Sequence, residues 1–202
     1  MIKNFGARVE KVWEDLRPLT KKMIVGALQA SSANLPTVQS QKFSYDTQLD
    51  WELSRLLTAL DEQLKDKEVK KDIAKLAEVS ELAETIVRVL ESKTESAEVF
   101  IQLAERVLKR NDYVKFDKLS DALPNRFSAA EIAEIIRQTE MAQIRAVAYE
   151  TLSLMPTSAL LPIFDDPLYS EIAINALEQQ AFEYESEEAR DVLEQIDFGN
   201  DD

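Results

Sequence analysis

From Thr37 to Leu123 the chain contains neither glycine nor proline. Tight β-hairpins need residues that accept a positive φ, such as glycine or an Asn-Gly or Asp-Gly pair, and no such pair lies between periodic segments. Apolar residues instead recur three and four positions apart, as they do along one face of a helix. The sequence therefore predicts an all-α protein.

The clearest helical stripe follows a possible capping pair formed by Thr47 and Asp50. Its members are Leu49, Leu53, Leu56, Leu60 and Leu64. Shorter stripes, one of which begins with Val69 and Ile73, predict further helices of about 10 to 15 residues that pack as antiparallel neighbours. Pro124 is expected to stop a helix at the residue before it, because that residue is pushed out of α geometry.

Two serines mark helix starts later in the chain. Ser128 and Glu131 have the spacing of a capping box, in which the serine accepts from a first-turn amide and the glutamate reaches back to the serine amide. Ser186 is placed to cap a last helix. Both positions predict helices that start at a defined residue.

Charge divides the chain at residue 44. Residues 1–44 have a net charge of +4, whereas residues 45–202 have a net charge of −18. A helix expected near Gly6 is interrupted at Pro18, and the stretch from Ser31 to Asp46 has no helical period and is interpreted as a linker. We therefore expect a basic N-terminal helical arm and linker (1–44) and an acidic all-α helical-repeat domain (45–202). We expect the arm to dock on the acidic domain rather than on a membrane or a nucleic acid.

Residues 144–152 and 169–177 form an internal repeat, in which an apolar, small, small, Leu pattern recurs after 25 residues. Between the two copies, the run LLPIF (160–164) is followed by DDP (165–167). Physics alone makes Asp166 a suitable N-cap and Pro167 a suitable first helical residue.

This arrangement resembles HEAT repeats, most clearly over residues 141–184. The resemblance implies an α-solenoid of short antiparallel helices over the C-terminal half, with a less regular helical N-terminal part. It also implies that Arg145 supports the turn of a neighbouring repeat through an aspartate. The structural repeat positions implied are Arg145, Asp165, Asp166 and Pro167.

The amino-acid composition excludes several kinds of active site. The chain has no cysteine and no histidine, which excludes Ser-His-Asp triads, thiolate chemistry and the usual zinc sites. Three acidic pairs, Asp165/Asp166, Glu131/Glu134 and Glu187/Glu188, carry oxygen donors suited to Mg²⁺ or Ca²⁺. No calcium-loop spacing accompanies them, so helix capping and solvated faces explain them better. We predict no catalytic residue, no cofactor and no metal.

The C-terminal stretch is the most acidic part of the chain. From Ala181 to Asp202 it contains nine acidic residues and one arginine. A solvated terminal helix face and a surface for a basic partner both account for this composition. The candidate partner-binding residues are Glu183, Glu185, Glu187, Glu188, Asp191 and Glu194.

These observations favour a non-enzymatic protein–protein interaction module that presents an acidic helical-repeat surface to a basic partner. One alternative is an acidic inhibitor or immunity-type protein that mimics nucleic acid against a basic enzyme, and another is a HEAT-like lyase or a carboxylate-metal enzyme. We expect a cytoplasmic location, no membrane span, and no nucleic acid bound through the acidic body. Trp13 and Trp51 lie on apolar faces, which predicts core packing for both.

Overall fold

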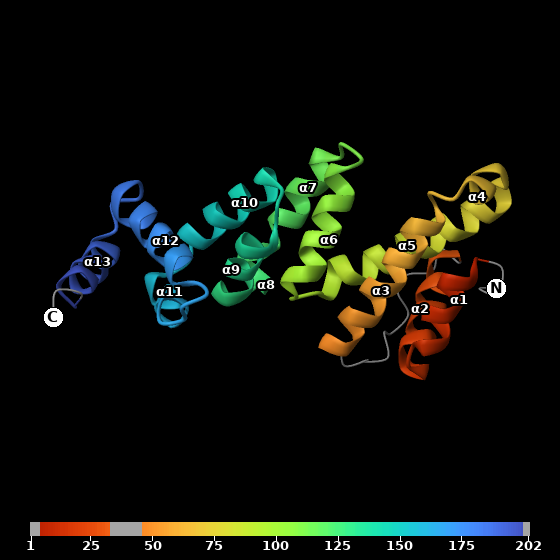
Figure 1. Cartoon of the computed structure of the whole chain (residues 1–202), viewed down its shortest axis with the longest axis horizontal. Coiled ribbons are helices and arrows are strands. Elements are labelled where there is room, and N and C mark those ends of the chain that lie inside the picture. The colour runs from red at the N-terminus through yellow and green to blue at the C-terminus, as the bar shows by residue number, and fades with distance from the viewer. Residues whose placement is uncertain (1–4, 33–45, 200–202) are drawn as a thin grey trace. The chain divides into compact units, whose positions relative to one another are not determined.

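The computed structural model describes residues 5–32 and 46–199, and every regular element in these ranges is a helix (Figure 1). The all-α prediction is therefore confirmed. The chain divides into two compact units, Met1–Thr94 (unit 1) and Glu95–Asp202 (unit 2). The domain boundary expected after residue 44 thus falls inside unit 1. Most of the expected linker, residues 33–45, lies outside the described residues.

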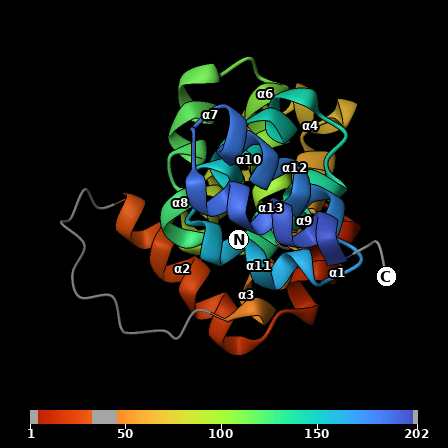
Figure 2. The same cartoon turned by 90° about the vertical axis from the view of Figure 1, so that its left-hand side faces the viewer.

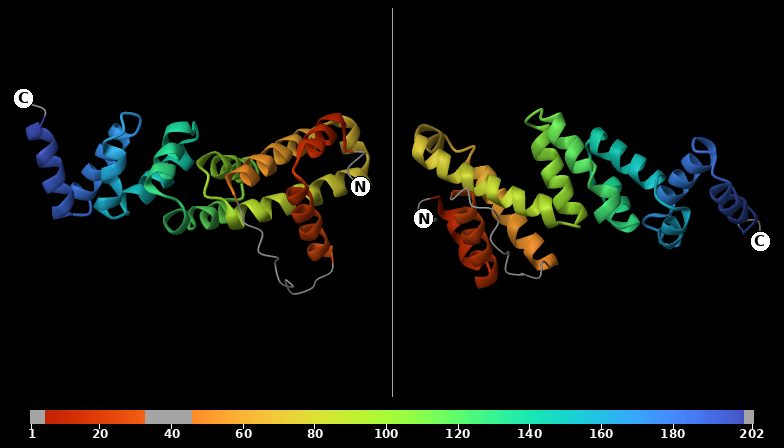
Figure 3. Two further views of the ribbon diagram at one scale, coloured as in Figure 1. Left: turned by 90° about the horizontal axis from the view of Figure 1, so that it is seen from below. Right: turned by 180° about the vertical axis from the view of Figure 1, so that it is seen from behind.

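Unit 1 is built around two long helices, α3 and α5, which pack side by side in opposite directions with the short α4 between them in the chain (Figures 1 and 3). Helix α1 packs on α3, and α2 packs on α5. Pro18 is the first residue of α2, where its missing amide costs no helical hydrogen bond. The helices are α1 (Ala7–Asp15), α2 (Pro18–Ser32), α3 (Thr47–Gln63), α4 (Lys67–Lys71) and α5 (Ile73–Lys93).

The leucine stripe of α3 forms much of the core of unit 1. Leu53, Leu56 and Leu60 are fully buried, in agreement with the predicted face. The start of the helix differs from the expectation, because Asp46 and not Thr47 is the N-cap. Its carboxylate Oδ1 accepts from the Leu49 amide at 2.8 Å, and an aspartate at this position satisfies a first-turn amide that has no helical partner.

Three further expectations for unit 1 are corrected. Helix α5 has 21 residues, longer than predicted, and the side chain of its first residue, Ile73, is 81% exposed. Trp51 is 51% exposed and not in the core, because α3 turns its leucine face inward and leaves the opposite face in solvent. The Arg55 guanidinium lies 4.4 Å from the Trp51 ring centroid, a cation–π arrangement. Trp13 is half-buried.

In unit 2, helices that are consecutive in the chain pack as pairs: α6 with α7, α9 with α10, and α11 with α12. Neighbouring pairs also contact each other, through α6 with α9, α9 with α11, and α10 with α12. Helix α13 packs on α12 and lies in front of it in Figure 2. The helices are α6 (Ala97–Leu108), α7 (Tyr113–Ser120), α8 (Leu123–Arg126), α9 (Ala129–Gln138), α10 (Ala142–Ser153), α11 (Thr157–Phe164), α12 (Ser170–Phe182) and α13 (Glu187–Gly199).

Leucine and isoleucine side chains make up most of the core of unit 2, and alanines and phenylalanines complete it. Ala148, Ala173 and Ala176 are fully buried and let α10 and α12 approach closely. Phe100 and Phe127 meet edge to face, with ring centroids 5.6 Å apart. The helix stop expected before Pro124 is wrong, because α7 has already ended at Ser120 and the proline lies inside the short α8.

Candidate partner-binding surface

The end of α12 is fixed to α10 and α11 by two glutamines. Gln180 is buried, and its Nε2 donates to the Met155 carbonyl at 2.6 Å while its Oε1 accepts from the Thr157 hydroxyl at 3.0 Å. The Ser153 hydroxyl donates to Gln179 Oε1 at 2.6 Å. The last turn of α12 therefore lies beside the end of α10 and the start of α11, and its side chains project from a firmly held backbone.

The turn between α12 and α13 is closed by local hydrogen bonds. Glu185 has a φ of 55°, in the left-handed region, and the Ser186 amide bonds the Gln180 carbonyl at 2.9 Å. The Ser186 hydroxyl accepts from the Ala189 amide at 3.3 Å, which confirms the predicted cap of the last helix. Arg190 Nε donates to the Ala181 carbonyl at 3.1 Å and ties α13 back to α12.

The six predicted acidic residues lie on this turn and on the first turns of α13, and all six side chains are exposed. Glu187, Asp191 and Glu194 are spaced to share one face of the helix. Among the described residues none of the six forms an ion pair; Glu183 accepts one hydrogen bond, from Gln179 Nε2 at 3.0 Å. We call these six residues the acidic surface.

Three large apolar side chains that were not among the predicted binding residues are exposed at the same end of unit 2. Phe182 is 74% exposed, Tyr184 is 45% exposed and Leu154, at the end of α10, is 63% exposed. Leu154 follows Ser153, which bonds Gln179 one turn before Phe182 and Glu183. The helical period places Phe182 nearly opposite the buried face of α12 formed by Ala173, Ala176 and Leu177, so the sequence does carry a signal for its exposure.

The four predicted repeat positions have structural roles, but not all of the expected ones. Arg145 donates to the Thr139 carbonyl at the end of α9, so it supports a turn through a backbone oxygen. Asp165 is exposed and is the C-cap that follows α11. The Asp166 carboxylate accepts from the Leu168 amide at 2.9 Å, but α12 begins only at Ser170. Pro167 therefore lies in the turn and not at the first helical position.

The capping box at Ser128 is half confirmed. The Ser128 hydroxyl accepts from the Glu131 amide at 3.2 Å as expected. The Glu131 carboxylate instead accepts from the Ala97 amide at 2.7 Å, so it caps α6. A glutamate on one helix thus satisfies a first-turn amide of another helix, which a local motif does not reveal.

Glu134 lies at the centre of a second polar group in unit 2. Arg137 binds its carboxylate in a bidentate manner, with both N–O distances at 2.6 Å. Gln138 and the Tyr169 hydroxyl also donate to it, the latter at 2.9 Å. Chiefly because of the Arg137 hydrogen bonds, and against the effect of partial burial, the pKa of Glu134 falls to about 2. The hydrogen bond that the Tyr169 hydroxyl donates to this carboxylate raises the pKa of Tyr169.

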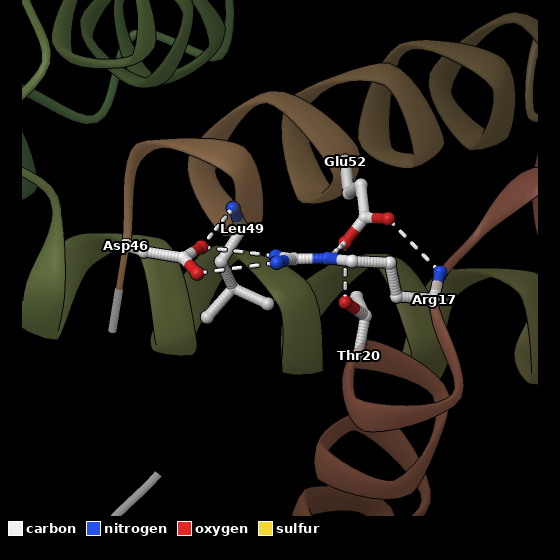
Figure 4. A network of polar contacts seen from close by, with 5 residues as sticks. All are labelled: Arg17, Thr20, Asp46, Leu49 and Glu52. Carbon is white, nitrogen blue, oxygen red and sulfur yellow. Dashed lines mark hydrogen bonds and ion pairs between the residues drawn. The ribbon is translucent and has the colours of Figure 1, made fainter. Parts of the chain in front are cut away.

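In unit 1, Arg17 joins α2 to the start of α3 (Figure 4). Its guanidinium binds Asp46 at 2.9 and 3.1 Å and Glu52 Oε2 at 3.0 Å, and its amide donates to Glu52 Oε1 at 2.9 Å. The buried Thr20 hydroxyl also donates to Glu52. Burial alone raises the pKa of Glu52, but these hydrogen bonds outweigh it and the pKa lies below its ordinary value. The network holds α2 in place, and all four of its polar side chains are bonded within it.

No group of three or more Asp or Glu side chains in the described parts of the chain is arranged to hold a metal ion. No helix in those parts is both long and apolar enough to cross a membrane. Comparisons with protein-family models, with curated proteins and with solved structures find no match. The acidic surface with its neighbouring apolar residues is the candidate site because its six carboxylates are exposed and form no ion pair among the described residues.

The backbone at Glu185 gives a stability prediction inside this surface. A left-handed φ costs a residue with a Cβ about 1 kcal/mol relative to glycine. Glu185→Gly is therefore expected to raise the free energy of unfolding of unit 2 by up to about 1 kcal/mol, measured by urea unfolding followed by circular dichroism. Glu185→Gln, which removes the charge but keeps the Cβ, serves as the control and should gain much less.

Proposed function

We propose that this chain is a non-enzymatic binding module that holds a basic protein partner on the acidic surface. The observation that carries the proposal is that six exposed carboxylates are gathered at the end of unit 2 without an ion pair among the described residues. Arg190 is the one cation in their stretch of sequence, and its Nε is engaged with the Ala181 carbonyl.

Electrostatics would act mainly on the rate and orientation of binding. Like charges one helical turn apart, such as Glu187 and Asp191, destabilise an isolated helix by a few tenths of a kcal/mol. A cationic partner relieves this repulsion and is steered toward the surface over about one Debye length, roughly 8 Å at physiological salt. Binding should therefore weaken as salt is added.

The proposal includes a HEAT-like α-solenoid in unit 2. It is supported by the packing of consecutive helices in pairs and by the contacts of each pair with the next. Stacking of this kind buries one continuous core and leaves the outer surfaces of the helices available for partners. A cytoplasmic location is also part of the proposal and rests on the amino-acid sequence alone.

A second candidate function is an acidic inhibitor of a basic enzyme. It is favoured by the net charge of −18 over residues 45–202, far above what solubility needs. The two functions differ in the partner. An inhibitor would hold one enzyme at 1:1 stoichiometry and block its activity, whereas a binding module would leave the activity of its partner intact.

The test compares three forms of the full chain as bait for proteins from the native host, eluted with increasing salt. One is wild type, and a second has the six residues of the acidic surface changed to Gln or Asn. The third is a control of equal charge, with six exposed carboxylates changed at other places. These are Glu78, Glu81, Glu95, Asp117, Glu140 and Glu150.

We expect a basic protein to bind the wild-type and control baits and to elute from them at high salt. The same protein should not bind the acidic-surface variant. Equal capture by all three baits would show that the acidic surface is not the binding site. Loss of capture from both variants would show that net charge, and not this surface, attracts the partner.

A further inference from the structure

The apolar side chains beside the acidic surface indicate what kind of segment binds there. We propose that Phe182, Tyr184 and Leu154 form an apolar centre that packs against an amphipathic basic helix of the partner. This inference rests on the proposed function and specifies the chemistry of its ligand. It requires the partner segment to carry both cations and an apolar face.

The exposure of these three residues is the first argument. Phe182 is 74% exposed and Leu154 is 63% exposed, although the core of unit 2 has other aromatic and leucine side chains that are almost fully buried. Large apolar side chains gathered at one place on a surface mark interaction sites, and aromatic residues are frequent among the residues that dominate binding. The backbone under them is held by Gln179 and Gln180, so little order would have to be gained on binding.

Charge complementarity is the second argument and commits the site to one occupant. Glu183 and Glu185 alternate with Phe182 and Tyr184 in the sequence, and Glu187 follows within two residues. A purely apolar segment would desolvate these carboxylates without compensation, whereas a purely cationic one would leave the rings in water. A segment with leucine-like residues on one side and lysine or arginine flanking them satisfies both.

The secondary structure of the site favours a helical ligand. A ligand strand needs a sheet edge to extend, and the described residues contain no strand. The Ser186 and Ala189 amides at the turn are already bonded to Gln180 and to the Ser186 hydroxyl. A helical ligand has its own backbone groups paired internally and is recognised through its side chains, and a helix presents apolar and basic side chains on defined faces.

The test uses the full chain and three labelled synthetic peptides of about five helical turns. The first carries leucines on one face and lysines on the other, the second has the same composition in scrambled order, and the third has the lysines with the leucines replaced by glutamine. Binding is measured by fluorescence anisotropy at low and high salt. The chain is used as wild type, as the double variant Phe182→Ala/Tyr184→Ala, and as Leu168→Ala.

Leu168 is the matched control, because it is 66% exposed but lies before the start of α12, at the opposite end of that helix from Phe182. We expect wild type and Leu168→Ala to bind the amphipathic peptide about equally, and the double variant to bind it about tenfold more weakly with the same salt dependence. The scrambled and glutamine peptides should bind wild type about as weakly as the amphipathic peptide binds the double variant.

The possible failures are distinguishable. If no lysine peptide binds in a salt-dependent way, both the proposed function and this inference are wrong. If all three peptides bind equally and the double variant matches wild type, the acidic surface attracts cations and only the inference is wrong. A loss as large in Leu168→Ala as in the double variant would also overturn it, because the effect would then not be specific to this end of α12.

Discussion

Glu52→Ala is expected to lower the free energy of unfolding of unit 1 by about 3 kcal/mol. Glu52 is 2% exposed and accepts from the Arg17 amide, the Arg17 guanidinium and the Thr20 hydroxyl. Removing the carboxylate leaves the buried Thr20 hydroxyl and the Arg17 amide without this acceptor. It also removes one of the two carboxylates that bind the Arg17 guanidinium. Arg17 keeps Asp46 and some contact with water, so we expect the low end of the range for a broken buried pair.

Tryptophan fluorescence measures this effect selectively, because both tryptophans of the chain, Trp13 and Trp51, belong to unit 1. The urea midpoint of the fluorescence transition should fall in Glu52→Ala. Glu52→Gln keeps the shape and one acceptor oxygen and should lose less. A midpoint for Glu52→Ala within error of wild type would mean that the network in Figure 4 does not hold α2 on α3.

The class of the fold and many helix positions could be predicted from local patterns. The leucine stripe of α3 and the caps at Ser128 and Ser186 depend on residues within one or two turns of each other, and the structure agrees with them. Two helix starts were predicted at the wrong residue, because a neighbouring residue in the sequence caps the helix or forms a turn before it. Asp46 displaced Thr47 as the cap of α3, and the turn after Asp166 delayed α12 to Ser170.

The polar contacts that fix the helices to one another could not be predicted, because their partners are far apart in the sequence. Glu131 has the right spacing for a capping box, yet its carboxylate reaches Ala97. Glu52 carries no signal that pairs it with Arg17. For Gln180 a signal did exist, since it continues the buried positions Ala173, Ala176 and Leu177 of α12, where an uncharged polar residue indicates an internal hydrogen bond.

In the candidate site, composition predicted the charge but not the surroundings. The acidic residues stood out because nine acids and one arginine occur within the last part of the sequence. The exposure of Phe182 follows from the helical period, because Phe182 lies nearly opposite the buried face of α12. Leu154 follows the last residue of α10, where the period no longer places side chains, so its position beside α12 needed the structure.

Glu134→Gln is expected to remove a component of the acid unfolding of unit 2. The pKa of Glu134 is about 2 in the folded chain, against an ordinary value of 4.5. Because the folded pKa is the lower one, the contribution of Glu134 to stability is fully present above about pH 4.5 and is lost as the pH falls toward 2. After allowance for solvent screening around a surface ion pair, we expect this contribution to be about 2 kcal/mol.

The measurement is the free energy of urea unfolding by circular dichroism as a function of pH, for wild type and Glu134→Gln. The other carboxylates titrate in both proteins, so the difference between the two curves isolates Glu134. That difference should be about 2 kcal/mol near neutral pH and should shrink as the pH falls below 4.5. Tyr169→Phe, which removes one donor to Glu134 but leaves Arg137 in place, should show part of the same loss. Parallel curves at every pH would mean that Glu134 has its ordinary pKa in the folded chain and that ionisation of its carboxyl group adds nothing to stability.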